Sequence, residues 1–331
     1  MRIAITAQDG NGDFQIPIAG PWTIFFKIFT EKGHEIVGFQ DSPNLIIFMN
    51  NHPRLLRKAN REFRSAKKIL ILWESSITRP QNFIKGDLST YDFIFTPSNE
   101  WIQGLNVRRF NWPQGPSNVE TLTLDSWNQR SDIPVIIQAN KYSFVKGEKY
   151  SLRRKLIFEM GKDLIVYGNN WNRYFANCKT LIQSLFLSLR YWYVVPFAWP
   201  KYVFVRPRKY GGFNCDKKTV LESSKFSIVI ENSSDYISEK IIESISFGSL
   251  VIYCGPPLSE FGLPSKIVYS CKHSSSDLIT AYHFLLKNKE QAFEIVSEAT
   301  KFHKSELFDT FHGDYVLEKL AIDILEEIGS N

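Results

Sequence analysis

The chain has 331 residues, which is long for one domain and sufficient for two domains with separate cores. Its 44% hydrophobic and 15% aromatic residues exclude an intrinsically disordered protein. The excess of 40 basic over 34 acidic residues is modest and favours anionic partners in general. Because no nucleic-acid motif accompanies this charge, no nucleic-acid partner is expected.

The first residues, MRIAITAQDGNG, read as a short strand ending in a turn. They have neither the apolar core nor the cleavage site of a signal peptide, so a cytoplasmic location is expected. Four cysteines are scattered without metal-ligand spacing: Cys178, Cys215, Cys254 and Cys271. Reduced thiols are therefore the expected state.

Apolar runs of strand length alternate with helical or loop stretches in the first part of the chain, as in βα units. These runs lie at 2–5, 35–39, 44–49, 69–73 and 92–96. A polar stretch from 114 to 132 follows them and contains the expected domain boundary. We predict a first domain at 1–125 and a second at 126–331.

A basic stretch before the fourth run, Arg54 to Lys68, has the apolar spacing of a helix. As a helix it places Leu55, Leu56, Ala59, Phe63 and Ala66 on one face and Arg54, Arg57, Lys58, Arg61 and Lys68 on the other. Such a basic face is usually solvated. Contact with an anionic lipid surface is the alternative.

A second set of apolar runs lies at 134–138, 164–167, 226–230, 250–254 and 266–269, and it predicts a second α/β sheet. From 275 to 328 the pattern is helical, because Val316, Leu320, Ile324 and Ile328 recur at a spacing of four. The fold class is therefore α/β, with two Rossmann-like halves.

The stretch from Phe226 to Pro257 reads as strand, acid-bearing turn, helix, glycine and strand. Glu231 and Asn232 follow the first strand, at the end where open α/β sheets bind ligands. Glu239 and Lys240 open the helix, where free N–H groups and the helix dipole favour an anion. A lysine at this end of a helix is out of place unless an anion joins it. The pattern therefore outlines a nucleotide-sugar diphosphate site.

These two segments, ENSSDYISEK and GSLVIYCGPP, resemble the donor-site signature of family 10 glycosyltransferases, the α-1,3-fucosyltransferases. The gap inside the first segment is shorter than in many members. Three further segments are similar to the family in the same order along the chain: ILILWESSITRPQN at 69–82, IIQANKYSFVKGEKYSLRRKLIFEM at 136–160 and LIVYGNNW at 164–171.

This resemblance implies a GT-B fold, with two facing Rossmann-like domains, a cleft between them, the donor in the second domain and the acceptor in the first. It implies inverting transfer of fucose from GDP-fucose to a hydroxyl, O3 of GlcNAc or Glc, on a glycan or lipid-linked oligosaccharide such as a lipopolysaccharide precursor. Glu74 would be the catalytic base. Arg153, with Arg154 as its alternative, and Lys240 would hold the phosphates. The remaining donor-site residues would be Asn140, Tyr167, Glu231, Asn232, Tyr236 and Glu239, with Glu239 on the ribose hydroxyls.

Each assignment has a plain structural alternative. Glu231 could bond nearby backbone at a turn, and Glu74 could be a solvated acid at a strand end. Arg153 lies in a basic cluster of the kind that usually covers a solvated surface, and Tyr236 could be a half-buried packing residue.

The resemblance implies that cationic side chains replace the divalent metal of other transferases, and the chain has no Asp-x-Asp triplet. No obligatory cofactor and no metal site are therefore expected.

The stretch 181–210 fits no family segment and forms part of a predicted insertion at about 172–207. It has seven aromatic residues between Arg190 and Phe204, and five basic residues without an acid between Arg190 and Lys209. Pro196 and Pro200 interrupt it, and a spanning helix needs about 20 apolar residues, so it does not cross a membrane. Core packing, peripheral contact with the inner face of a membrane, and a wall for stacking sugars all stay open.

Three functions are compatible with the sequence. The first is the fucosyltransferase. The second is the same scaffold with another nucleotide-sugar donor, and the third is a non-catalytic, degenerate transferase that binds membranes or nucleic acid. Donor hydrolysis assays separate the first two, and binding of vesicles or oligonucleotides without nucleotide affinity would favour the third.

Overall fold

The computed structural model describes residues 1–7, 13, 22–83, 88–99, 106–114, 121–141, 143, 145–172 and 205–329. The chain folds into two compact units. The first comprises Met1–Pro116, Asp235–Ile237 and Glu306–Asn331, and the second comprises Ser117–Ser234 and Ser238–Ser305.

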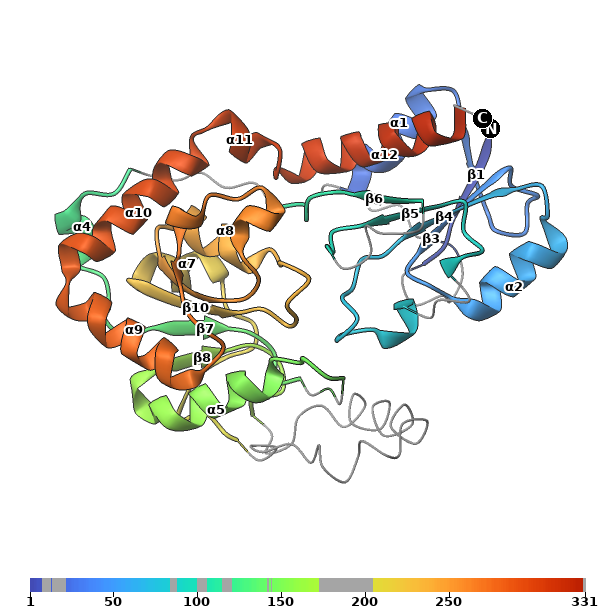
Figure 1. Ribbon diagram of the computed structural model, residues 1–331. Coiled ribbons are helices and arrows are strands. Elements are labelled where there is room, and N and C mark those ends of the chain that lie inside the picture. The colour runs from blue at the N-terminus through green and yellow to red at the C-terminus, as the bar shows by residue number, and fades with distance from the viewer. Residues whose placement is uncertain are drawn as a thin grey trace. The chain divides into compact units, whose positions relative to one another are not determined.

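The first unit is built on a six-stranded sheet of order β2-β1-β3-β4-β5-β6, and every neighbouring pair is parallel (Figure 1). Its strands are β1 (Arg2–Ile5), β2 (Glu35–Val37), β3 (Leu45–Met49), β4 (Lys67–Ile71), β5 (Phe93–Thr96) and β6 (Val107–Arg109). Its helices include α1 (Trp22–Glu31), α2 (Pro53–Glu62), α11 (Glu306–Asp309) and α12 (Gly313–Gly329), and a short 3-10 helix, η1 (Pro80–Phe83), follows β4.

Strand β3 is apolar throughout because both faces of this sheet are covered. Leu45, Ile47 and Met49 pack against α1 and α12. Ile46 and Phe48 alternate with them and pack on the opposite face, against α2. Figure 1 shows these helices on the two faces of the sheet.

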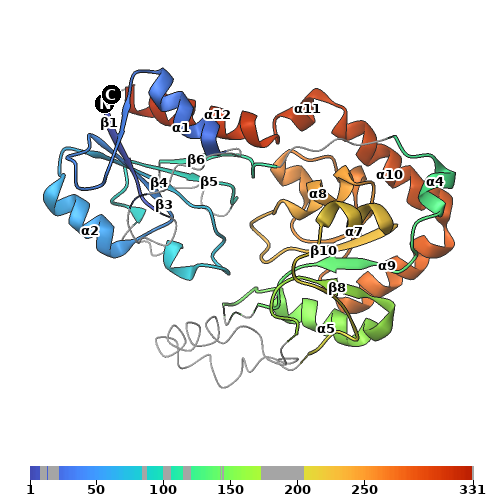
Figure 2. The same cartoon turned by 180° about the vertical axis from the view of Figure 1, so that it is seen from behind.

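The second unit has a parallel six-stranded sheet of order β12-β11-β10-β7-β8-β9 (Figure 2). Its strands are β7 (Val135–Ile137), β8 (Ile165–Tyr167), β9 (Lys209–Gly212), β10 (Phe226–Ile230), β11 (Leu250–Cys254) and β12 (Tyr269–Ser270). Its helices include α4 (Leu124–Asn128), α5 (Tyr150–Met160), α7 (Lys217–Ser223), α8 (Lys240–Ser246), α9 (Ser275–Lys287) and α10 (Lys289–His303), with 3-10 helices η2 (Gly161–Asp163), η3 (Leu258–Phe261) and η4 (Ser265–Ile267).

The larger core of the second unit lies on one face of this sheet. Phe226, Ile228 and Ile230 of β10 pack there with side chains of α5, α9 and α10. On the other face, Ser227 Oγ lies 2.9 Å from Ser244 Oγ of α8. One face of β10 therefore packs in the apolar core, and the other face makes a polar contact with α8.

The predicted strands 2–5, 226–230 and 250–254 are confirmed to the residue. The predicted strand 266–269 is wrong at its start, where η4 stands, and pairing with β11 begins only at Tyr269. Strands β6 and β9 were not anticipated. Two of the four residues of β9 are glycines, which carry no strand pattern.

The predicted helix 54–68 is too long. It ends at Glu62, and Phe63 is its C-cap. Residues from Lys67 onward pair with β3, and Lys68 is 7% exposed, with its Nζ donating to Ala66 O at 2.8 Å. Pairing with β3 therefore outweighs continuation of the helix, and Lys68 is removed from the predicted basic face.

The units divide the chain differently from a boundary at residue 125, because the last helix belongs to the first unit. Helix α12 packs on that unit's core through Val316, Leu320 and Ile324, with Ile328 at its edge. The predicted spacing of four therefore describes the buried face of α12. Among the helices of the described ranges, none is both long and apolar enough to cross a bilayer.

Candidate functional site

Polar residues gather at the carboxyl edge of the second sheet. Glu231 and Asn232 follow β10, Gly255 follows β11, and Asn140 stands shortly after β7. Because all these strands are parallel, their carboxyl ends meet at one edge. The structure thus brings together residues that are far apart in sequence.

Glu231 lies below the surface of this edge, with 1% of its area exposed. One carboxylate oxygen accepts from Ser238 N at 3.0 Å and from Ser238 Oγ at 3.1 Å. Burial raises the pKa of Glu231, and the nearby charge of Lys240 and the bonds from Ser238 oppose that rise. Glu231 therefore fixes the turn that leads into α8. This supports the alternative in which it bonds the backbone of its own turn.

Lys240 is the first residue of α8, and Glu239 is its N-cap. The ammonium donates to Glu239 Oε1 at 2.9 Å and to Ser238 Oγ at 3.2 Å, and the Lys240 and Glu239 side chains are 24% and 29% exposed. Burial lowers the pKa of Lys240, but the carboxylates of Glu239 and Glu231 outweigh it and leave the pKa above its usual value. Burial likewise raises the pKa of Glu239, but Lys240 reverses the shift and leaves it low. Both groups are therefore charged at neutral pH.

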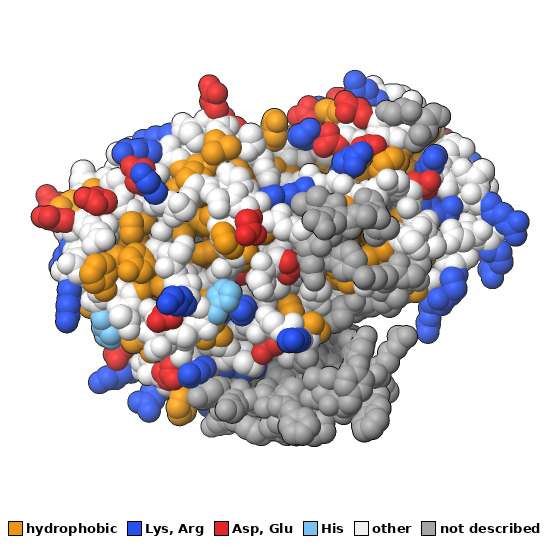
Figure 3. All heavy atoms as spheres, viewed as in Figure 1, with side chains coloured by type: hydrophobic (Ala, Val, Ile, Leu, Met, Phe, Trp, Pro, Cys, Tyr) orange, Lys and Arg blue, Asp and Glu red, His pale blue; other side chains and the backbone are white. Residues whose placement is uncertain are grey.

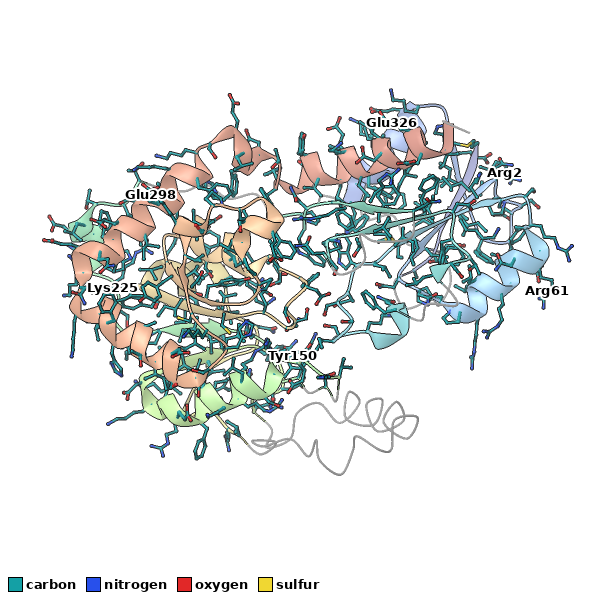
Figure 4. The ribbon with its side chains drawn as sticks, in the orientation of Figure 1. Arg2, Arg61, Tyr150, Lys225, Glu298 and Glu326 are labelled. Carbon is teal, nitrogen blue, oxygen red and sulfur yellow. The ribbon has the colours of Figure 1, made fainter. Side chains whose placement is uncertain are left out.

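Arg153 is 3% exposed, and its guanidinium forms hydrogen bonds at the carboxyl ends of β7 and β10. It donates to Ala139 O at 3.0 Å, to Ile230 O at 3.2 Å and to Asn232 Oδ1 at 3.1 Å. Burial lowers its pKa to about 10, which still leaves it charged at neutral pH. The guanidinium lies 5.2 Å from the ring of Tyr150, which Figure 4 labels at the start of α5.

Arg154 is also buried, 1% exposed, and donates to Lys141 O and to Ser151 Oγ. Neither arginine forms the solvated basic surface that the sequence alternative described. Both are instead hydrogen-bonded within the second unit.

A residue that sequence reasoning did not single out, Lys149, lies half-buried at the same edge. Its backbone N–H donates to Asn232 O at 3.2 Å, and its Nζ lies 2.8 Å from His273 Nδ1. Because His273 Nε2 lies 3.3 Å from the carbonyl of Gly255, that nitrogen donates and Nδ1 accepts from Lys149. One sequence feature could have identified Lys149: it is the N-cap of α5, a position where Ser, Thr, Asp or Asn is preferred.

Several buried polar atoms at this edge have no hydrogen-bond partner among the described residues. They are Gln138 Oε1, Asn140 Oδ1, Arg153 Nε, Ser233 Oγ and Tyr253 Oη. Such atoms are rare in folded proteins and require an explanation, such as a ligand or ordered water. Five of the twelve such atoms in the described residues thus lie near the carboxyl ends of β7, β10 and β11, which makes this edge a candidate ligand site.

Asn140 and Tyr167 are held by the second unit itself. Asn140 is fully buried, its N–H donates to Asn169 O at 2.9 Å, and its Nδ2 donates to Asn170 O at 3.3 Å. Tyr167 is half-buried and packs beside Val220 and Leu221 of α7. Burial raises the pKa of its hydroxyl. Tyr167 is thus at the correct strand end, with its ring packed against protein.

Tyr236 belongs to the first unit, with Asp235 and Ile237. It is 4% exposed, and its ring centroid lies 5.3 Å from that of Trp112. Within the same unit, Ser98 Oγ donates to Asp235 Oδ2 at 2.8 Å. The sequence alternative of packing therefore describes what the structure shows of Tyr236, and its role along a donor stays a prediction.

Glu74 is half-buried in the loop after β4, in the first unit. Its neighbour Trp73 contacts three aromatic rings, with centroid distances of 4.9 Å to Trp22, 5.8 Å to Phe110 and 4.4 Å to Trp112. Glu74 therefore follows a rigid aromatic cluster. The other predicted site residues, except Tyr236, belong to the second unit, so the structure does not test their assembly with Glu74.

No group of three or more His, Cys, Asp or Glu within the described ranges is placed to hold a metal ion. Independence from a metal stays a prediction. Cys215, Cys254 and Cys271 are free thiols. Burial raises the pKa of Cys254 to about 11 and that of Cys271 to about 12. Cys178 and the aromatic stretch from 181 to 204 lie outside the described residues.

Comparison with known proteins shows the fold. No protein-family model matches the sequence, and no curated protein has a significant match to it. A solved structure of HepE from Anabaena with UDP-glucose is 11% identical, with a TM-score of 0.57 over 98% of this chain and 99% of that one. An α1,3-fucosyltransferase structure is 12% identical, with a TM-score of 0.58 over 100% of this chain and 90% of that one.

An α-glucosyltransferase in complex with UDP-glucose and DNA is 10% identical, with a TM-score of 0.52 over 98% and 99% of the two chains. Together with the two parallel six-stranded sheets, these similarities confirm the predicted GT-B fold of two Rossmann-like domains. At this identity they show the fold alone.

Proposed function

We propose that the protein is an inverting glycosyltransferase that moves fucose from GDP-fucose to O3 of a GlcNAc or Glc residue in a glycan or lipid-linked oligosaccharide. The observation that carries the proposal is the carboxyl edge of the second sheet. There a charged lysine opens α8 beside buried polar atoms that have no partner within the described residues. The family 10 resemblance and a similar α1,3-fucosyltransferase structure with GDP-fucose, 11% identical with a TM-score of 0.52, support the choice of donor.

In this proposal the second domain binds the nucleotide diphosphate. Lys240 stabilises the negative charge that develops on the leaving phosphate, and Lys149 adds a second ammonium at the same edge. Arg153 serves as a positioning residue, because its guanidinium already binds Asn232 and two carbonyl oxygens. Glu239 holds ribose hydroxyls, and the unpartnered Asn140 Oδ1 accepts a donor hydroxyl.

The first domain supplies the base. Glu74 takes the proton of the acceptor hydroxyl as its oxygen forms a bond to the anomeric carbon. The bond from that carbon to the phosphate oxygen breaks, and its electron pair leaves with the nucleoside diphosphate. Attack from the opposite side inverts the anomeric configuration. No step in this sequence requires a metal ion.

The test of this proposal is transfer of labelled fucose from GDP-fucose to acceptors that carry GlcNAc or Glc. Glu74→Gln should reduce transfer by about 100-fold or more, because it removes general-base catalysis. Nucleotide affinity should stay within about twofold of the wild type, since the nucleotide binds to the second domain. Glu62→Gln, an exposed change in the same unit, is the control and should keep full activity. Near-normal transfer by Glu74→Gln would refute the assignment of the base.

A second donor is favoured by a specific observation. HepE and the α-glucosyltransferase, which share the fold, were solved with UDP-glucose. The same scaffold could therefore use UDP-glucose, and hydrolysis of each nucleotide sugar without an acceptor separates the two donors. If the protein binds no nucleotide at all, a degenerate transferase is favoured instead.

We also propose peripheral contact with the inner face of an anionic membrane through α2. Arg54, Arg57 and Arg61 are exposed, and their spacing places them on one side of the helix, while the exposed Arg64 follows its C-cap. Blue side chains gather over this region in Figure 3, and Arg61 points away from the unit in Figure 4. Leu56 and Ala59 are buried beneath the helix, so contact would be electrostatic and would not involve insertion.

A further inference from the structure

A buried group of carboxamides lies at the carboxyl edge of the first sheet. Asn50 and Asn51 follow β3, and Asn82 stands in η1. Asn50 is 1% exposed, and Asn51 and Asn82 are fully buried. Burying a carboxamide costs free energy unless its donors and acceptors are bonded, so a cluster of three needs a connected network.

The hydrogen bonds of this network lead to the backbone of the predicted base. Asn50 Oδ1 accepts from Trp73 N at 3.2 Å and from Asn82 Nδ2 at 2.8 Å. Asn82 Nδ2 also donates to Glu74 O at 3.4 Å. The Trp73 N–H and the Glu74 carbonyl are therefore both held by side chains of this cluster.

The far side of the network is anchored in the core. Asn82 Oδ1 accepts from Asn51 N at 3.0 Å, and Asn51 Oδ1 accepts from the hydroxyl of Tyr91 at 3.0 Å. Tyr91 is 7% exposed and packs edge-on against Phe48 of β3. The network thus connects the rigid sheet to the loop that carries Glu74.

The backbone at Asn50 is unusual. Its φ is 74°, in the left-handed region that L residues rarely adopt, and Asn is one of the few side chains that tolerate it. Its N–H is bonded to Ile71 O at 2.8 Å. Strained residues of this kind persist where the surrounding structure fixes them, and they concentrate at functional sites.

The same loop has a second anchor. His52 Nε2 lies 3.1 Å from Met49 O, so that nitrogen donates and His52 Nδ1 accepts from Arg79 Nη2 at 3.2 Å. Arg79 N in turn donates to Ser75 O at 2.9 Å. The loop is therefore fixed on both sides of Glu74.

We infer that Asn50 and Asn82 are positioning residues that orient Glu74 for proton abstraction. They act through the Trp73 and Glu74 backbone and do not themselves contact the substrate. The inference rests on the proposed function, because it takes Glu74 as the base. A small error in the position of a base reduces the rate strongly, which is a reason to keep a costly buried network next to it.

The test compares two variants and a core control in the transferase assay. Asn50→Gly keeps the left-handed backbone and removes the carboxamide, and it should lower kcat by about 10- to 100-fold with both KM values within about twofold. Asn82→Asp removes the N–H donors and should act in the same direction. Ile46→Val, a core change in β3, is the control for lost stability. If Ile46→Val lowers the melting temperature as much as Asn50→Gly does and loses as much kcat, the positioning role is refuted.

A double variant separates this inference from the proposed function. In the Glu74→Gln background, Asn50→Gly should add little to the loss, because both changes act through one group. Independent, multiplied losses would overturn the inference and leave the base assignment intact. Full activity of Glu74→Gln alone would overturn the base assignment, and the inference with it.

Discussion

Gly255 follows β11 at the ligand edge of the second sheet and leaves no room for a side chain. A Cβ at this position would lie 2.2 Å from Tyr253 Oη and 2.9 Å from Glu231 Cγ. Its φ lies outside the positive range, so the requirement for glycine is steric. Tyr253 and Glu231 are both buried, and Glu231 also accepts from Ser238 in the turn that leads to Lys240.

Gly255→Ala should therefore destabilise the protein by about 1–3 kcal/mol through overpacking and also weaken nucleotide binding. Gly262→Ala is the matched control in the same unit. Gly262 has a φ of 74°, and beyond its own residue and its two chain neighbours nothing lies within 4 Å of the position that its added methyl carbon would take. Its substitution should cost about 1 kcal/mol of backbone strain without changing affinity. Thermal melts and nucleotide titrations of both variants test this, and equal affinities would contradict it.

The sequence predicts which residues belong to the site better than it predicts how deeply each of them is buried. Glu231, Asn232 and Lys240 were found because strand, turn and helix signals surround them. Arg153 was expected on the phosphates, but it aligns on α5 with Tyr150, Ile157 and Met160, which are all buried. That spacing of three, four and seven was present in the sequence and indicates a face turned toward the sheet. The buried face of α5 was missed because the neighbouring basic residues suggested a solvated surface.

At the scale of elements, the strands with continuous apolar runs were predictable, since both of their faces are covered. Strands β6 and β9 were not, because VRR and KYGG depend on pairing with β5 and β8 and carry no pattern of their own. The end of α2 was missed for a related reason. Lys67 and Lys68 belong to a strand that the partner β3 selects.

The exposed arginines of α2 predict salt-sensitive binding to anionic vesicles. The variant Arg54→Glu/Arg57→Glu/Arg61→Glu should bind vesicles containing phosphatidylglycerol about 100-fold more weakly, at about 1 kcal/mol per charge near the surface. The wild type should release them as ionic strength rises. Sedimentation with vesicles at low and high salt measures both effects.

Lys162→Glu/Lys287→Glu/Lys289→Glu carries the same change in net charge at exposed positions of the second unit, and it should bind as the wild type does. Equal binding by the arginine variant and the wild type would remove α2 from the proposed membrane surface. Equal binding of the wild type to neutral and to anionic vesicles would also remove α2 from the proposed membrane surface.

At the scale of the whole molecule, two parallel sheets with helices on both faces were predictable from alternating apolar runs and helical stretches. The return of the chain to the first unit was not. Helix α12 shows a buried stripe in its sequence, but nothing local in that stripe specifies that it packs on α1. The site divides in the same way: each half can be located from its own sequence, whereas their assembly depends on both units.

The central claim is that the second unit binds a nucleoside diphosphate through Lys240, and calorimetric titration with GDP, UDP and CDP tests it most directly. In the presence of a chelator, GDP should bind with a dissociation constant on the order of micromolar. Added manganese should not change it. Lys240→Ala should abolish measurable binding, and Lys218→Ala, an exposed lysine of α7, should not. Absence of binding to every nucleotide, or unchanged binding by Lys240→Ala, would contradict the account.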